Sequence, residues 1–332
     1  MRDLILGLPE QLRWAARLDV SGVPAADEAL VVAMGGSAIG GDVASVIAAE
    51  AGRRLSVHRG YGLPGWAARH RPLVVAVSHS GATEETLDAV DAARDAGLDV
   101  AAVTTGGVLG DRAAGSGWAR VEVPDGPQPR AAMGSLTGAV LRVAEGAGLL
   151  PPQADALEEA ADVVDRLLGG GDGPGVGLAD DLAEALEGRV AVVYGGAGPG
   201  AVAARRWKTQ INENAKAPAY AGEVPEIDHN EVVGWEAVPG LSLDRIGIVW
   251  LRDAGDHPRV DARVRVTAEV IDELVTTAGE VWSTGSGTLA RLFSLSVIGD
   301  LVSDALAARA GVDPMPVDVI TELKERLARE DA

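Results

Sequence analysis

Cysteine is missing from this sequence of 332 residues. Its absence excludes disulfide bonds and thiolate metal sites, and it fits a reducing compartment. Aromatic residues are also scarce, at 3% of the chain, although hydrophobic residues as a whole make up 47%. A chain of this length suggests two domains or one large domain, with a core built mainly from Ala, Val and Leu.

Long apolar runs are absent as well. No stretch approaches the roughly 20 apolar residues of a membrane-spanning helix, and the N-terminus lacks the apolar segment of a signal peptide. Basic residues are outnumbered, with 29 Lys and Arg against 49 Asp and Glu, which gives a net charge of −20. This charge disfavours nucleic acid and anionic membranes as partners. We therefore expect a cytoplasmic protein that binds neither of them.

Lysine and asparagine occur only three times each, and their distribution is uneven. Five of these six residues fall within positions 208–230: Lys208, Asn212, Asn214, Lys216 and Asn230. Chance or a local helix is one explanation. We favour a functional site, because lysine offers a compact charge that can donate a proton and asparagine both donates and accepts hydrogen bonds.

Apolar strands alternate with helical segments in both halves of the chain, which is typical of a doubly wound, parallel, flavodoxin-like α/β fold. In the first half, five strands are expected, with helices at about 1–18, 83–96 and 130–146. Two amphipathic helical segments around a glycine-rich break follow. We place a domain boundary there, which divides the chain into residues 1–150 and 151–332.

The second half repeats the order of the first. "RVAVVYGGAGPG" matches "ALVVAMGGSAIGG", so Gly35–Gly36 and Gly195–Gly196 are expected at equivalent positions. "RIGIVWLRDAGD" stands in the place of "PLVVAVSHSGAT", so only the first copy carries a hydroxyl-rich turn. Residues 283–327 are predicted to be largely helical, with a break at "GVDPMP".

The hydroxyl-rich turn places Ser78, Ser80 and Thr83 around Gly81, after an apolar strand and before a helix. Ligands of open parallel sheets lie beyond the carboxyl ends of the strands, and helix N-termini attract anions. The turn is therefore a candidate phosphate site that needs no basic side chain. The alternative is that Ser80 or Thr83 only caps the helix, which leaves the other two hydroxyls unexplained.

A glycine-rich turn, "MGGSAIGG", follows the first strand. It fits the dinucleotide-binding pattern GxGxxG only loosely, and no Walker sequence is present, so neither an NAD(P) enzyme nor an NTP-binding protein is favoured. The turn is either part of a ligand site, where glycine permits close approach, or a plain strand-to-helix connection.

"SHSGATEET" resembles the Ser-x-Ser-Gly-x-Thr-x-Glu motif of sugar isomerase (SIS) domains, which bind phosphosugars. Further segments resemble, in order, the bifunctional phosphoglucose/phosphomannose isomerase family: "MGGSAIGGD", "QPRAAMG", "INENAKAPAYAGEVPEIDHNEVVGW" and "GVDPMPVDVITELKERL". The resemblance covers nearly the whole chain. It implies two tandem SIS domains, a phosphorylated hexose substrate and aldose–ketose isomerisation through a cis-enediol, without metal or cofactor.

The resemblance also implies roles for single residues. Glu213 would be the base that moves a proton between C1 and C2, and His229 would assist ring opening from the partner subunit of a homodimer. Lys324 would donate at the ring oxygen or hold developing negative charge, and Arg130 would steady the enediolate. Five residues of the first half would bind the phosphate: Gly36, Ser37, Ser78, Ser80 and Thr83.

Each of these assignments has an alternative. Glu213 could be a solvated helix residue, His229 a turn residue and Lys324 a partner of a neighbouring Glu on the last helix. A phosphosugar sensor would keep the hydroxyl-rich turn but would not need these three residues, so an enzyme is favoured. Substrate preference stays open, because the chain departs from the family at Ala38, His79 and Ala82.

Overall fold

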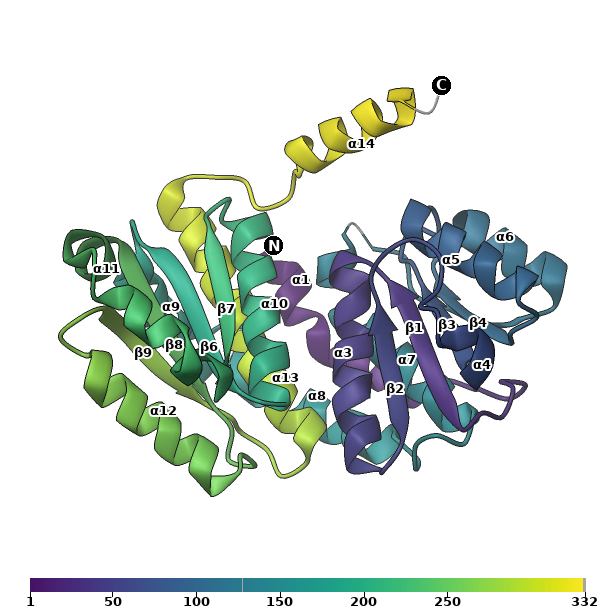
Figure 1. The fold of residues 1–332 in the computed structure, drawn as a ribbon, viewed down its shortest axis with the longest axis horizontal. Helices are drawn as coiled ribbons and strands as arrows, with labels where there is room; N and C mark the ends of the chain where they lie inside the picture. Colours follow the sequence, from purple (N-terminus) through teal and green to yellow (C-terminus); the bar gives the residue numbers. More distant parts are fainter. Residues whose placement is uncertain (127, 331–332) are drawn as a thin grey trace.

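The computed structural model describes residues 1–126 and 128–330, in which two parallel sheets are covered by helices (Figure 1). The first sheet has the strand order β2-β1-β3-β4-β5, which is the flavodoxin-like order. Its strands are β1 (Glu28–Ala33), β2 (Arg54–His58), β3 (Leu73–Val77), β4 (Val100–Thr104) and β5 (Ala119–Glu122). All neighbouring pairs are parallel, which confirms the predicted fold class.

The helices expected at about 83–96 and 130–146 are present, whereas the helices at 67–70 and 107–116 were not predicted. The helices of the first half are α1 (Arg2–Leu6), α2 (Leu8–Ala16), α3 (Gly35–Glu50), α4 (Ala67–His70), α5 (Glu84–Asp95), α6 (Gly107–Ser116), the 3-10 helix η1 (Pro129–Ala131) and α7 (Met133–Gly146). The prediction of a single helix over 1–18 is wrong, because the helix is interrupted at Gly7. Pro9 has no N–H for a continued helical ladder, and it fits the first turn of a new helix instead.

The second sheet, in the order β7-β6-β8-β9, repeats the order of the first four strands of the first sheet. Its strands are β6 (Val190–Gly196), β7 (Ala219–Val224), β8 (Ile246–Arg252) and β9 (Thr276–Trp282). The helices are α8 (Ala154–Leu168), η2 (Gly169–Gly171), α9 (Pro174–Leu186), α10 (Pro199–Asn214), η3 (Glu226–His229), η4 (Glu231–Trp235), α11 (Pro239–Arg245), α12 (Pro258–Ile271), α13 (Thr288–Ala310) and α14 (Asp318–Glu330).

The expected equivalence of the two glycine pairs is wrong. Gly35 and Gly36 begin α3, whereas Gly195 and Gly196 are the last residues of β6, and α10 begins only at Pro199. A Cβ on Gly195 would lie 2.3 Å from the carbonyl oxygen of Gly200, so this glycine serves the contact between β6 and α10. Glycine recurs in both turns for different steric reasons.

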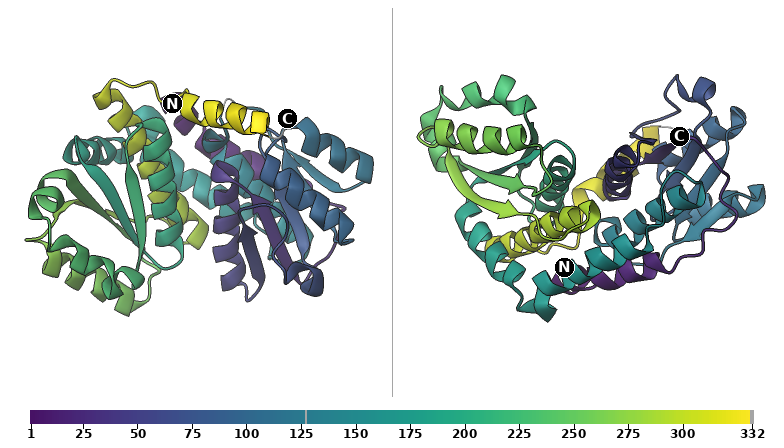
Figure 2. Two further views of the ribbon diagram at one scale, coloured as in Figure 1. Left: turned by 45° about the horizontal axis from the view of Figure 1, so that its top comes forward. Right: turned by 90° about the horizontal axis from the view of Figure 1, so that it is seen from below.

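One apolar core joins the two halves. Buried side chains of α2, α7, α8, α10 and α13 belong to a single cluster that reaches both sheets. The helices α3 and α10 face each other between the sheets (Figures 1 and 2), where Arg205 of α10 donates to Asp42 of α3 at 2.9 Å.

The segment expected to link the domains is part of this packing, because α8 contacts both α2 and α13. The division into residues 1–150 and 151–332 stays a prediction, and residues 331–332 lie outside the described part. Within residues 1–126 and 128–330, none of the helices combines the length and the apolar character needed to cross a membrane.

Candidate active site

The predicted phosphate-binding hydroxyls lie together at the carboxyl edge of β1 and β3. Ser78 is fully buried, and its Oγ lies 2.8 Å from Thr83 Oγ1 and accepts from the Thr83 N–H at 3.4 Å. The N–H of His79 donates to Ser37 Oγ at 3.4 Å, which ties the start of α3 to the same turn. Ser80 is exposed at its tip. The structure therefore gathers all four hydroxyls that the sequence had singled out.

Helix capping does not account for these hydroxyls. Thr83 stands at the N-cap position of α5, but its side chain makes no capping hydrogen bond. Ser80 Oγ accepts from the N–H of Ala82 at 3.3 Å, which precedes the helix. The helix α3 also begins without a side-chain cap. Two helix N-termini with uncapped first-turn N–H groups thus flank the turn, as anion sites require.

The hydroxyl-rich turn packs against a glycine pair, Gly106 and Gly107, that the sequence analysis missed. Gly81 has a φ of +65°, and a Cβ there would lie 1.9 Å from the carbonyl oxygen of Gly106. A Cβ on Gly107 would lie 2.5 Å from the carbonyl oxygen of Ser80. Thr105 Oγ1 donates to the carbonyl oxygen of His79 at 2.7 Å. The sequence "TTGG" after the fourth strand was the available signal.

Of the three departures from the family, two are buried in this region. Ala38 is fully buried in α3, and His79 is 6% exposed. Within the described residues the His79 Nε2 atom has no hydrogen-bond partner. Burial lowers the pKa of the imidazole, and the charge of Asp125 opposes this shift only in part. The neutral form of this ring is thus favoured beside the hydroxyl-rich turn, and Ala82 is exposed at the surface of the turn.

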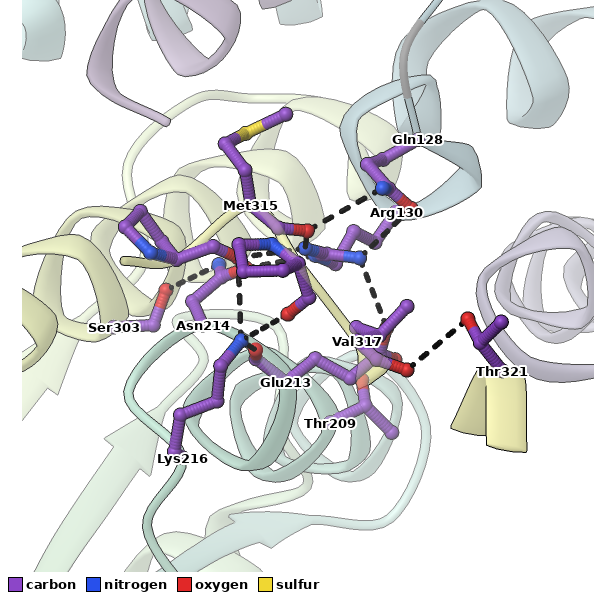
Figure 3. A network of polar contacts seen from close by, with 12 residues as sticks. Gln128, Arg130, Thr209, Glu213, Asn214, Lys216, Ser303, Met315, Val317 and Thr321 are labelled. Carbon is purple, nitrogen blue, oxygen red and sulfur yellow. Dashed lines mark hydrogen bonds and ion pairs between the residues drawn. The ribbon is translucent and has the colours of Figure 1, made fainter. Parts of the chain in front are cut away.

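Arg130, only 3% exposed, is the centre of the polar network in Figure 3. Burial lowers the pKa of its guanidinium, and the carboxylate of Glu213 opposes this shift. A guanidinium has five N–H donors. All five are bonded within the chain, to Asn214 Oδ1 (2.8 Å), Gln128 Oε1 (3.0 Å), Glu213 Oε2 (3.3 Å), Pro314 O (2.7 Å) and Met315 O (2.9 Å). Arg130 therefore has no donor left for a ligand in this conformation.

Gly36 connects the hydroxyl turn with this network. A Cβ on Gly36 would lie 3.1 Å from the backbone nitrogen of Arg130, so the start of α3 packs directly on η1. The next residue, Ser37, contacts the turn, while the side chain of Arg130 reaches Glu213 at the end of α10. A continuous series of contacts thus runs from the hydroxyls of the turn through Arg130 to the carboxylate of Glu213, across the junction of the two halves.

A cavity of about 430 Å³ lies beside Glu213, whose side chain is 27% exposed. Its walls are Asn212 near the end of α10, Lys216 just after this helix, and residues 316–320, which run from the segment before α14 into its first turn. A cavity of this size suits a small ligand. A larger cavity, of about 620 Å³, borders the amino end of β6 and includes Lys216 but not Glu213, so the smaller one is the candidate site.

A buried ion pair that the sequence analysis missed supports Arg130 from behind. Arg206 donates to Asp300 at 2.7 Å and to the carbonyl of Arg130 at 3.0 Å. Burial raises the pKa of Asp300, and the charge of Arg206 acts against this shift. Asn214, which is also fully buried, donates to Ser303 at 2.9 Å. These contacts fix both the backbone and the side chain of Arg130.

His229 and Lys324 do not join Glu213 within the chain. Glu213 lies near the end of α10, before β7 begins, and His229 lies in η3, after β7 has ended; no hydrogen bond or ion pair joins the two within the described part of the chain. His229 is exposed. Lys324 lies on α14, which has no buried residue, and it has no hydrogen bond or ion pair with any described residue. Within one subunit, its predicted pairing with a neighbouring Glu is therefore not seen either.

The second half fills the equivalent turn with carboxylates. Asp253 accepts from Arg291 Nε at 2.8 Å, and the ring of His257 caps α12. A Cβ on Gly196 would lie 2.4 Å from the carboxylate of Asp256. Burial and the charge of Asp253 raise the pKa of Asp256 to about 6. No group of three or more His, Asp or Glu side chains in residues 1–126 and 128–330 is arranged to hold a metal ion.

Comparison with known proteins shows the family to which the chain is similar. Residues 176–327 match the family described as bacterial phospho-glucose isomerase C-terminal SIS domain. The chain is 37% identical to the bifunctional phosphoglucose/phosphomannose isomerase of Caldicellulosiruptor bescii, over 99% of both chains. It is 35% identical to the enzyme of that name from Aquifex aeolicus, over 89% of both.

A solved structure agrees at the level of the fold. The C-terminal domain of glucosamine-fructose-6-phosphate aminotransferase from Francisella tularensis superposes with a TM-score of 0.68 at 15% identity. The match covers 94% of this chain and 96% of that domain. This similarity shows that the fold with two parallel sheets also occurs in a distant protein.

Proposed function

This chain belongs to the bifunctional phosphoglucose/phosphomannose isomerase family, and from that premise we propose that it interconverts glucose 6-phosphate and mannose 6-phosphate with fructose 6-phosphate. The observation that carries the proposal is the 3.3 Å hydrogen bond from Arg130 to Glu213, next to the start of α3 and the hydroxyl turn. The contacts from Gly36 to Arg130 and from Arg130 to Glu213 connect this carboxylate with the start of the hydroxyl turn, and this connection supports a joint role in one reaction.

The phosphate of the sugar would lie on the turn after β3. Four hydroxyls and the N-termini of α3 and α5 surround this position: Ser37, Ser78, Ser80 and Thr83 supply the hydroxyls. Helix N-termini carry a positive partial charge and free N–H groups, and Gly36 allows close approach of the backbone. A chain with a net charge of −20 could in this way bind a dianion without a lysine or arginine at the phosphate.

Glu213 would act as the base. Its carboxylate would take the proton from C2 of the aldose and deliver it to C1, while a hydroxyl proton moves between O1 and O2 of the cis-enediol. Because the five donors of Arg130 are engaged, we assign Arg130 to orient the Glu213 carboxylate, in place of direct contact with the enediolate. Its positive charge would still stabilise negative charge that develops nearby.

His229 and Lys324 would contribute in a cytoplasmic homodimer. Both are exposed, and His229 lies at the opposite end of β7 from Glu213. A second copy could bring its His229 to the sugar of the first for ring opening. Lys324, on a helix without buried residues, would reach the ring oxygen only after α14 has moved or packed.

The test is to incubate the purified protein with glucose 6-phosphate or mannose 6-phosphate and to detect fructose 6-phosphate. We expect turnover of both sugars. Glu213→Gln should lower kcat by about 10²–10⁴ with little change in KM, which is the usual contribution of a general base. Glu223→Gln, an exposed glutamate on β7, is the matched control and should keep the wild-type rate.

Two results would contradict the proposal in different ways. Tight binding of sugar phosphates by the wild type without turnover would indicate a phosphosugar sensor. Full activity of Glu213→Gln would leave an isomerase but remove Glu213 as its base.

A further inference from the structure

Lys216 has an unusual backbone conformation. Its φ is +56°, and among the described non-glycine residues only Arg71 shares a positive φ. This conformation is unfavourable for a residue with a Cβ and persists where the surrounding structure holds it. Lys216 is also one of only three lysines in the chain, and the proposed chemistry gives it no role.

The ammonium group of Lys216 binds only backbone carbonyls. Nζ donates to Glu213 O at 2.6 Å and to Pro316 O at 2.6 Å, and it lies 3.5 Å from Pro314 O. The first carbonyl belongs to the end of α10, and the other two belong to the segment before α14 (Figure 3). One side chain thus links the helix that carries Glu213 to the segment that leads to Lys324.

Arg130 binds the same segment from the other side. Its Nη2 donates to Pro314 O at 2.7 Å and to Met315 O at 2.9 Å. The carbonyls of residues 314, 315 and 316 are therefore all bound to a cation. We call Lys216, Arg130 and these three carbonyls the carbonyl clamp.

The sequence of the segment explains why it needs a clamp. Pro314 and Pro316 have no backbone N–H, so the segment cannot form a helical ladder or pair fully as a strand. Its carbonyls are the groups left for hydrogen bonds, and strong donors with a positive charge hold them best. Met315 N–H donates to Asp313 at 2.8 Å and adds no contact to the body of the protein.

The clamp determines the shape of the candidate site. Residues 316–320 form one wall of the cavity beside Glu213, and Lys216 lines the same cavity. Beyond the clamp, α14 has no buried residue that could fix its position. Contacts before α14 must therefore set where the cavity wall begins and from which point Lys324 extends.

We propose that Lys216 is a positioning residue that, with Arg130, clamps the carbonyls of residues 314–316 and so fixes the wall of the Glu213 cavity and the origin of the arm that carries Lys324. The catalytic consequence of this inference rests on the proposed isomerase function. The clamp itself does not, because it can be measured without substrate.

The test compares three variants by amide hydrogen exchange and by steady-state kinetics. Lys216→Asn removes the amine but keeps a residue that tolerates positive φ, and Lys216→Gly removes both the amine and the strain. Lys208→Asn, on the helix α10 that precedes Lys216, is the control. We expect exchange of the amides in 315–321 to rise about tenfold in both Lys216 variants, as expected for the loss of roughly one hydrogen bond's stabilisation. The control should exchange like the wild type.

The kinetic expectation is a fall in kcat of about tenfold with KM changed less than twofold, because the phosphate turn is untouched. Unchanged exchange in the Lys216 variants would overturn the clamp, whatever their activity. Faster exchange with an unchanged kcat would overturn the role in positioning. If Lys216→Gly exchanged like the wild type while Lys216→Asn exchanged faster, backbone strain at this position would explain the faster exchange. That result would overturn the role of the amine. An inactive wild type would refute the isomerase function, while the exchange data would still decide on the clamp.

Discussion

The turn after β3 and the turn after β8 occupy the same place in their two sheets, and they are built from different side chains. Ser78 begins the first turn, and its hydroxyl lies 2.8 Å from the hydroxyl of Thr83. Asp253 begins the second turn, and its carboxylate accepts from Arg291 at 2.8 Å. The ring of His257 caps α12, whereas α5 has no side-chain cap. The second turn thus caps its helix with one of its own side chains, whereas the first turn leaves the N-terminus of α5 without a side-chain cap.

This difference separates what the fold requires from what a ligand requires. Both turns connect a buried strand to a helix, so a connection of this kind forms with hydroxyls or with carboxylates. The hydroxyls of the first turn are not needed for the strand order, because the second sheet has the same order without them. Their presence is therefore better explained by an anion that binds once per chain.

The largest expected effect comes from Ser78→Asp, which gives the first turn the residue that begins the second. Two unit charges about 4 Å apart repel by about 4 kcal/mol at an effective dielectric constant of 20. We therefore expect kcat/KM for a sugar phosphate to fall about a thousandfold, measured by fructose 6-phosphate formation. Ser78→Ala is the control and should cost only about tenfold, the contribution of one hydrogen bond to a charged group.

The result would contradict the phosphate assignment if Ser78→Asp and Ser78→Ala lost activity equally. Circular dichroism and the melting temperature of both variants would show whether the buried carboxylate disturbs the fold. If Ser78→Asp lost sugar-phosphate binding at an unchanged melting temperature, the hydroxyl of Ser78 would serve the ligand and not the stability of the fold.

The second effect concerns the support below the first turn. Gly81→Ala places a Cβ 1.9 Å from the Gly106 carbonyl oxygen at a φ of +65°, so the turn has to move. We expect the free energy of unfolding to fall by about 3 kcal/mol in urea denaturation, as for other backbone substitutions at special positions. Gly97→Ala has a similar φ of +62° but no atom within 4 Å, and it should cost only about 1 kcal/mol.

Equal losses in Gly81→Ala and Gly97→Ala would mean that the left-handed conformation, and not the contact with Gly106, makes glycine necessary. In that case the packing of the turn on the glycine pair after β4 would have no energetic importance.

The two turns also mark how far sequence alone could predict this molecule. The alternation of strands and helices, the internal repeat and the hydroxyl turn follow from local patterns: apolar runs, glycine turns and three hydroxyls within six residues. The contacts of Arg130 could not be predicted in this way, because it binds the carbonyl of Pro314, 184 residues away. A backbone carbonyl has no signature in the sequence. The pair of Arg206 and Asp300 was missed for the same reason, since only the packing of α10 on α13 brings the two together.

A third, smaller effect is expected at the tip of the first turn. Ser80 is exposed, and its Oγ accepts from the N–H of Ala82 at 3.3 Å. Ser80→Ala should raise KM for a sugar phosphate about tenfold and leave kcat nearly unchanged, because a hydrogen bond to a charged phosphate at an exposed position contributes about 1.5 kcal/mol. The unphosphorylated sugar should show no change in KM, and an equal change for both sugars would place Ser80 away from the phosphate.

The smallest effect tests the carboxylates of the second turn. The pKa of Asp256 is raised from 3.8 to about 6, so its carboxyl group binds a proton more tightly in the folded than in the unfolded chain. The contribution of Asp256 to the free energy of unfolding is therefore greatest below pH 4 and falls as the pH rises from about 4 to 6, where the folded protein loses this proton. Asp256→Asn cannot ionise and should be about 1 kcal/mol more stable than the wild type at pH 7.5, after allowance for solvent screening of a half-exposed group. Urea denaturation at pH 4 and pH 7.5 measures the difference, with Asp111→Asn on the surface of α6 as the control. If the stability of Asp256→Asn kept the pH dependence of the wild type, the Asp256 carboxylate would be solvated in the folded protein. The second turn would then not be filled by a buried carboxylate, and its contrast with the first turn would be lost.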